Sequence, residues 1–452
     1  MRRPTAADFR ALIDLAFPLA AVQVGLMAMG LVDSAMVGRV SAEALGGVAI
    51  ANVWFFVVST IGMGCMYALD PVIAQAKGAG DEAGIALGLQ RGLLIAALIS
   101  LPTTVALAQG ERLLAATGQT PGMVPLAGQY ITWLLTGMFP YFGFLAFRQT
   151  LQALGAVRPV LIVILAANLL NVGINWIFIF GHWGAPALGV RGAALATTIS
   201  RWAMFLGLAA ITWPVLRRYL RPWRPQTARL EPLRRMLGIG IPLGLQILAE
   251  YGVFGLVGLL LGRIGTEAVA GHQIALNYAA ITFMVPLGIG AAAAALVGQA
   301  VGAGDLDRAR RVAGAALTTG AVFMTITAGV LVLIPNWLAA LYSPDAGVIA
   351  VAASLIPLAG VFQVFDGTQA VGMGVLRGIG DTRAPVVINV LGYYLVGLPV
   401  GLYLGFRMDQ GALGLWWGLV IGLAAVAVAL VLRVSIRMRR DLRRVEIDTR
   451  PG

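Results

Sequence analysis

Twelve long runs of apolar residues are the feature that most limits what this chain can fold into. Each run holds about 20 residues, the length that a helix needs to cross the hydrocarbon core of a bilayer. The runs lie near residues 15–37, 47–69, 89–108, 127–147, 160–181, 192–214, 236–261, 275–297, 312–334, 348–375, 386–405 and 412–432. Only 12% of the 452 residues are charged, about half the share that is usual in a soluble protein. The sequence therefore predicts an all-α integral membrane protein with twelve transmembrane helices.

The basic residues are distributed unevenly between alternate loops. Counted from the N-terminus, 26 of the 32 lysines and arginines fall on one side of the predicted membrane, seven of them between Arg217 and Arg235. Basic loops stay on the cytoplasmic side, so both termini and this segment are expected there. The even number of spans on each side of the segment predicts six plus six helices. This distribution accounts for the net charge of +12, and no nucleic-acid partner is expected.

The second half of the chain repeats the first at an offset of about 224 residues. Pro18 matches Pro242, and QAKGAGD from Gln75 matches QAVGAGD from Gln299. Because each half has an even number of spans, both insert the same way round, which predicts a pseudo-two-fold axis along the membrane normal. The predicted parts are an N-terminal six-helix bundle (1–216), a basic cytoplasmic linker (217–235), a C-terminal six-helix bundle (236–436) and a basic cytoplasmic tail (437–452).

Four acidic residues lie in or at the end of apolar runs: Asp33, Asp70, Glu250 and Asp366. A carboxylate in hydrocarbon costs about 2.5–3.5 kcal/mol on insertion scales, so it usually faces a cavity or a partner and marks an ion or substrate path. In the repeat, Asp33 corresponds to Val257 and Glu250 to Leu26, so these charges were not duplicated with the scaffold. We expect one acidic pocket at Asp33 and a second formed by Glu250 with Asp366. Asp70, directly before Pro71, is expected to have mainly a structural or gating role.

Amides accompany these carboxylates. Asn168, Asn171 and Asn175 share one face of a helix, where they could line an ion pocket or hydrogen-bond neighbouring helices. Their place in the same bundle as Asp33 favours the pocket. Secondary candidates are Asn168, Thr197, Gln363, Asn277 and Asp70.

The chain carries no sign of ATP hydrolysis or of enzyme chemistry. Its one lysine, Lys77, is followed by Gly78, so no phosphate-binding G-x-x-x-x-G-K-[ST] loop is present. Two histidines and one cysteine provide neither a zinc cluster nor a nucleophile and base set. We expect a protein that is not an enzyme, has no cofactor and binds no metal apart from possible Na⁺ at the acidic sites. Intramembrane carboxylates suit H⁺ or Na⁺ as the coupling ion.

The chain resembles the multidrug and toxic-compound extrusion (MATE) family over nearly its whole length, most of all its NorM-type bacterial branch. The matching stretches are MGLVDSAMVG around Asp33, NLLNVGINWIFIFG around Asn171, AEYGVFGLVGLLLGRIGTEAVAGHQIALN around Glu250, VGQAVGAGD from Val297 and FDGTQAVGMGVLRGIGDTRAP around Asp366. The resemblance implies an N-lobe cation site at Asp33, Asn171 and Asn175. It also implies a C-lobe cation site at Glu250 and Asp366.

The expected function is secondary active multidrug efflux, in which H⁺ or Na⁺ is exchanged for cationic or amphipathic organic compounds by alternating access. The expected place is the bacterial inner membrane, as a monomer in contact with the bilayer. A flippase for a lipid-linked saccharide is the alternative, but basic residues would be expected to line its cavity, and only Arg201 lies inside a span. A purely structural membrane protein would not need the unduplicated acidic residues.

Overall fold

The structure, a computed structural model, describes residues 3–120 and 122–448, and every regular element in these ranges is helical. The first half contains α1 (Ala6–Val37), α2 (Ala42–Tyr67), α3 (Leu69–Gly78), α4 (Glu82–Ala108), α5 (Gly110–Ala116), α6 (Met123–Leu134), η1 (Leu135–Gly137), α7 (Met138–Ala153), α8 (Arg158–Phe180), η2 (His182–Gly184) and α9 (Val190–Leu220). The second half contains η3 (Pro225–Ala228), α10 (Leu230–Gly262), α11 (Thr266–Gly302), α12 (Leu306–Leu333), α13 (Pro335–Ala340), α14 (Ala346–Gly378), α15 (Arg383–Val390), η4 (Leu391–Gly397), α16 (Leu398–Leu402), η5 (Tyr403–Arg407) and α17 (Gly411–Arg439).

Twelve helical stretches among the described residues are long and apolar enough to cross a membrane, which confirms the predicted number. Most are longer than the apolar runs. The second stretch covers Ala42–Gly78 rather than 47–69, and the first begins at Ala6 rather than at residue 15. The predicted limits were too short because hydropathy marks only the part of a helix that hydrocarbon can cover. A helix continues through polar flanking residues as long as its backbone hydrogen bonds remain satisfied.

The helices repeat as the sequence does. Each long helix of the second half begins 221 to 225 residues after its counterpart, so that α10 corresponds to α1, α11 to α2 with α3, and α17 to α9. The loops repeat as well. Asp81 accepts a hydrogen bond from the backbone N–H of Gly84, and Asp305 accepts the equivalent bond from Arg308, both at 2.8 Å. These two residues are N-caps, as expected for acidic residues at helix starts.

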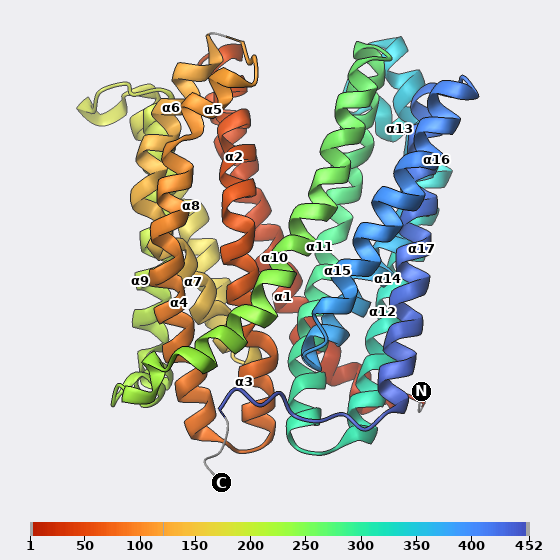
Figure 1. The fold of residues 1–452 in the computed structure, drawn as a ribbon. Coiled ribbons are helices and arrows are strands. Elements are labelled where there is room, and N and C mark those ends of the chain that lie inside the picture. The colour runs from red at the N-terminus through yellow and green to blue at the C-terminus, as the bar shows by residue number, and fades with distance from the viewer. Residues whose placement is uncertain (1–2, 121, 449–452) are drawn as a thin grey trace. The chain divides into compact units, whose positions relative to one another are not determined.

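The chain forms two compact units, which we call the N-terminal unit (22–244 with 446–452) and the C-terminal unit (1–21 with 245–445). In the N-terminal unit, α2 packs against α6, α4 against α7, and α8 against α9. In the C-terminal unit, α14 packs against α11, α12 and α17. Figure 1 shows the helices of each unit side by side, red to yellow-green for one and green to blue for the other. Helices α1 and α10 each contribute to both units, and the predicted bundle limits at 216 and 236 remain a prediction.

Helices α1 and α10 are each shared between the two units. The first part of each packs closely on another helix at a glycine, α10 on α2 and α1 on α11. A Cβ atom on Gly64 of α2 would lie 2.1 Å from the backbone nitrogen of Gly244 of α10. At the corresponding place in the repeat, a Cβ atom on Gly288 of α11 would lie 2.5 Å from the backbone nitrogen of Ala20 of α1. Both contacts require glycine, because they are shorter than any carbon can make without displacing a backbone. The repeat therefore preserves the helix packing as well as the helix order.

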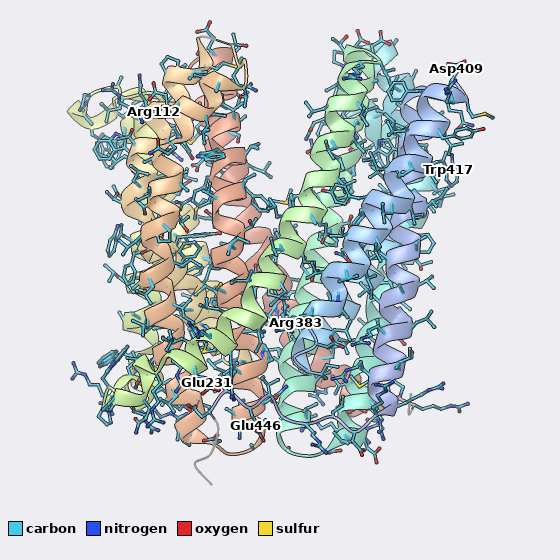
Figure 2. All side chains as sticks on the ribbon, viewed as in Figure 1. Arg112, Glu231, Arg383, Asp409, Trp417 and Glu446 are labelled. Carbon is cyan, nitrogen blue, oxygen red and sulfur yellow. The ribbon has the colours of Figure 1, made fainter. Side chains whose placement is uncertain are left out.

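Large apolar side chains also cover outward-facing positions of the helices. Phe17, Leu169, Leu259 and Leu333 are each at least 74% exposed. Exposed apolar surface of this extent indicates a membrane-facing exterior. Several charged residues lie near helix ends, as Glu82 and Glu231 do in the first turns of α4 and α10. Figure 2 shows Arg112 at one end of the N-terminal unit and Glu231 and Glu446 at the opposite end.

Candidate cation sites

The N-terminal unit holds Asp33 in a network of short hydrogen bonds. Asn175 Nδ2 donates to Asp33 Oδ1 at 2.5 Å, and Thr197 Oγ1 donates to Asp33 Oδ2 at 2.8 Å. Asn175 Nδ2 also donates to Asn171 Oδ1 at 3.0 Å. These side chains come from three helices, α1, α8 and α9, and all are buried. The structure thus brings together Asp33, Asn171, Asn175 and Thr197.

Two polar atoms of this cluster have no hydrogen-bond partner. They are Asn175 Oδ1 and Asn171 Nδ2, and both are buried. A buried amide usually satisfies its oxygen, so the unpartnered oxygen of Asn175 is available as an acceptor or ligand for a bound group. A proton could be held at Asp33. A small cation could be held by the carboxylate together with amide and hydroxyl oxygens, the ligands that hard cations prefer.

The C-terminal unit holds a second pair of carboxylates, Glu250 on α10 and Asp366 on α14. They are 9% and 6% exposed, and they lie close enough for their charges to interact. Unlike Asp33, neither forms a hydrogen bond or ion pair with any residue in the described ranges. Two ionised carboxylates without partners in an apolar interior repel each other strongly. The pair is therefore suited to take up a proton or a small cation.

Aromatic and amide side chains surround this pair. Tyr393 in η4 is fully buried, lies near both carboxylates and donates from its hydroxyl to Gln369 Oε1 at 3.0 Å. Phe254 contacts the rings of Phe362 and Tyr393, with centroids 5.8 and 6.5 Å apart. These apolar rings reduce the access of water and strengthen electrostatic interactions at the carboxylates.

Gln363 and Gln369 lie on α14, three residues before and three residues after Asp366. Gln363 is fully buried, its Oε1 accepts from Thr327 at 3.3 Å, and its Nε2 has no partner. The structure therefore places this predicted residue in the same buried segment as Asp366. Sequence reasoning missed Gln369 and Tyr393. The helical spacing could have identified Gln369, whereas nothing in the run LGYYLVG distinguishes Tyr393 from Tyr394.

Two secondary candidates, Asn168 and Asn277, make other contacts. Asn168 Nδ2 donates to the backbone carbonyls of Gly25 at 3.0 Å and Ile164 at 2.9 Å, so it links α8 to α1. Asn277 Oδ1 accepts from Gln273, four residues earlier on the same helix. Neither is hydrogen-bonded to Asp33, Glu250 or Asp366.

Asp70 lies in a separate buried cluster of the N-terminal unit. It is 1% exposed and lies in the first turn of α3. Its Oδ1 accepts from Gln149 at 3.0 Å and from Gln152 at 3.3 Å, both on α7. These bonds join α3 to α7, and the structural or gating role of Asp70 remains a prediction.

Comparison with known proteins agrees with this architecture. A family model described as MatE matches residues 18–177 and 242–403, more than half of the chain. The chain is 36% identical over 446 residues to a probable multidrug resistance protein NorM of Mesorhizobium japonicum, covering 96% of this chain and 94% of the relative. It is 34% identical over 450 residues to the multidrug resistance protein PmpM of Pseudomonas aeruginosa, covering 97% and 94%.

Solved structures share the fold. The crystal structure of the eukaryotic MATE transporter AtDTX14 superimposes with a TM-score of 0.87 at 24% identity, covering 95% of this chain and 96% of that one. At this identity the likeness concerns the fold alone. The assignment to a family rests on the family model, which matches more than half of the chain. This multi-pass membrane protein belongs to the MatE family and is a transporter rather than an enzyme.

Proposed function

We propose that this chain exports cationic or amphipathic organic compounds in exchange for H⁺ or Na⁺ by alternating access. Its relatives carry the name multidrug resistance protein. The observation that carries the coupling mechanism is the pair Glu250 and Asp366, two buried carboxylates without a hydrogen-bond or ion-pair partner among the described residues. A transporter needs such a site, because an ion can drive a conformational change only if the ion binds two conformations with different affinity.

The proposed cycle uses this difference in affinity. In one conformation the carboxylates bind the ion, and their charge is neutralised. In the other they are ionised and favour an organic cation. Because each ligand stabilises a different conformation, binding of one weakens binding of the other by the same factor, and that reciprocal coupling is the exchange. Asp33, held by Asn175 and Thr197, is proposed as a second coupling site in the N-terminal unit.

The proposal extends to location and assembly. The excess of basic residues in alternate loops supports cytoplasmic termini in a bacterial inner membrane. We propose a monomer, because each carboxylate site is built from the helices of one unit of one chain. A flippase for lipid-linked saccharides is not favoured, since the relatives carry multidrug resistance names.

Reconstitution into liposomes tests this function. Ethidium movement is measured under an imposed proton gradient and then under a sodium gradient. Glu250→Gln and Asp366→Asn should each reduce gradient-driven transport at least tenfold. Glu267→Gln, which alters an exposed glutamate in the first turn of α11, is the matched control and should transport like the wild type. Full gradient-driven transport by both site variants would overturn the C-lobe assignment.

A further inference from the structure

Three arginines among the described residues are more than nine-tenths buried, and two of them donate hydrogen bonds, although the Nε atom of each is buried without a partner. Arg91 forms a bidentate pair with Asp448, with nitrogen–oxygen distances of 2.8 and 2.7 Å, and also donates to the Gln226 carbonyl. Arg148 donates to Gln23 Oε1 at 2.9 Å. The third, Arg201, forms no hydrogen bond or ion pair with a residue in the described ranges, and its Nη1 atom is buried without a partner.

Two aromatic rings surround the guanidinium of Arg201. Its central carbon lies 4.1 Å from the ring centroid of Phe55 and 5.1 Å from that of Tyr141. Arg201 is on α9, Phe55 on α2 and Tyr141 on α7, and all three belong to the N-terminal unit. Aromatic faces attract a cation, but they do not replace the directional acceptors that five N–H donors require. The surroundings therefore stabilise the charge while leaving the donors unused.

An arginine is costly in this position. Arg201 is the twelfth residue of the 31-residue helix α9, well inside a membrane-spanning stretch, and it is 7% exposed. A buried cation without a hydrogen-bonded anion is strongly destabilising, and such groups in membrane proteins usually mark a functional site. Any local packing role could be filled by an uncharged side chain of similar length. The unused donors therefore point to a ligand that brings its own acceptors.

The chemistry of that ligand follows from the geometry. The planar guanidinium fork matches the two oxygens of a carboxylate, which it binds bidentately. The flat faces of Phe55 and Tyr141, in edge contact with centroids 5.4 Å apart, favour an aromatic body next to the acid group. Inorganic phosphate would satisfy the donors but would gain nothing from the rings.

Arg201 lies one helical turn from Thr197, a residue that contacts Asp33. Thr197, which donates to Asp33, precedes Arg201 by four residues on α9, so both side chains lie on one face of the helix, one turn apart. A ligand with a carboxylate and an amino group could therefore place its negative end at Arg201 and its positive end toward Asp33. We propose that Arg201 binds the carboxylate of aromatic zwitterionic substrates. This proposal rests on the proposed function and names one substrate class for it.

A matched pair of compounds tests the proposal. Norfloxacin, which has a carboxylate, is compared with its ethyl ester, and ethidium serves as a cation without an acid group. In proteoliposomes, Arg201→Met should reduce norfloxacin transport about tenfold relative to the wild type and leave transport of the ester and of ethidium within about twofold. Arg201→Lys keeps the charge but loses the fork and should give an intermediate loss. Arg191→Met, an exposed position on the same helix, should change none of the three.

Equal losses for all three compounds in Arg201→Met would overturn the proposal and assign Arg201 a structural role. The proposal would also be overturned if the ratio of norfloxacin transport to ester transport were the same in Arg201→Met as in the wild type. Binding to detergent-solubilised wild type without a gradient provides a second readout, in which norfloxacin should bind at least tenfold tighter than its ester. Equal binding, or competition by inorganic phosphate as strong as by benzoate, would contradict the proposal. Failure of gradient-driven ethidium transport by the wild type would instead contradict the proposed function and leave this binding comparison intact.

Discussion

At the scale of single residues, the two carboxylate sites differ in how they are held. Asp33 accepts from Asn175 and Thr197, whereas Glu250 and Asp366 have no such bonds with the described residues. Hydrogen bonds from two helices, α8 and α9, fix the position of Asp33 on α1, so they tune its affinity for an ion. The affinity of the C-terminal pair depends mainly on mutual repulsion and on the apolar rings around it.

The asparagines of α8 provide a residue-scale prediction. Asn168 and Asn175 look equivalent in sequence, but Asn168 bonds only to backbone carbonyls, whereas Asn175 bonds to Asp33. Asn168→Ala should lower stability by about 1 kcal/mol, the usual worth of a hydrogen bond, and leave gradient-driven transport near wild type. Asn175→Ala should reduce transport several-fold. Thermal unfolding in detergent and ethidium transport measure the two effects, and an equal transport loss in both variants would contradict the distinction.

The candidate site could be predicted only in part at this scale. The cost of a carboxylate in hydrocarbon identifies Asp33, Glu250 and Asp366 from hydropathy alone. Which neighbour contacts them depends on helix rotation, which a single sequence does not determine. For that reason Asn168 and Asn175 could not be separated, and Tyr393 was missed although it is fully buried near both acids.

At the scale of elements, helix number and repeat were predictable because both follow from patterns longer than 20 residues. The irregular elements were not. The span Arg383–Arg407 contains two π-helical segments, η4 and η5, and no composition signal separates them from the α-helix between them. Similarly, α2 and α3 are separate helices within one membrane-spanning stretch, Ala42–Gly78. The break between them falls where Pro71 lacks the N–H that would bond to the carbonyl of Tyr67, four residues earlier, so a local residue accounts for it.

The close approach of α10 to α2 gives an element-scale prediction. Gly64→Ala places a methyl group 2.1 Å from a backbone nitrogen, so the helices must separate, at a cost of about 1–3 kcal/mol. Gly30→Ala in α1 is the matched control, since its Cβ atom meets nothing within 4 Å. The first variant should lower the thermal unfolding midpoint and the second should leave it unchanged or raise it. Equal midpoints would show that the two helices do not pack as described.

The C-terminal tail is a further element whose contacts can be tested. Asp448 pairs bidentately with buried Arg91, and Arg235 donates to the carbonyls of Glu446 and Ile447. Asp448→Asn leaves the arginine charge without its anion and should destabilise the protein by about 2 kcal/mol, measured by thermal unfolding. Asp441→Asn, at an exposed tail position, is the control and should have no effect. Loss of stability in both variants would indicate a general charge effect instead of the specific pair.

At the scale of the whole molecule, the duplicated scaffold and the unduplicated charges serve different purposes. The repeat supplies two units with the same helix order and the same close helix contacts. The acidic residues and Arg201 then give each unit its own chemistry, with a hydrogen-bonded aspartate in one and an unpartnered pair of acids in the other. The predicted pseudo-two-fold axis and the sidedness of the termini follow from the sequence pattern alone and stay predictions.

The central claim is that ion movement and drug movement are coupled through the buried carboxylates. Because this coupling is reciprocal, drug movement should in turn drive ion movement, and that gives the most direct test of the claim. Wild-type proteoliposomes loaded with ethidium, with no ion gradient imposed, should move H⁺ or Na⁺ inward as ethidium leaves, as recorded by a pH-sensitive or sodium-sensitive dye. Proteoliposomes with both Glu250→Gln and Asp366→Asn should show no such ion movement. Ethidium efflux from wild-type liposomes without countermovement of either ion would contradict the account.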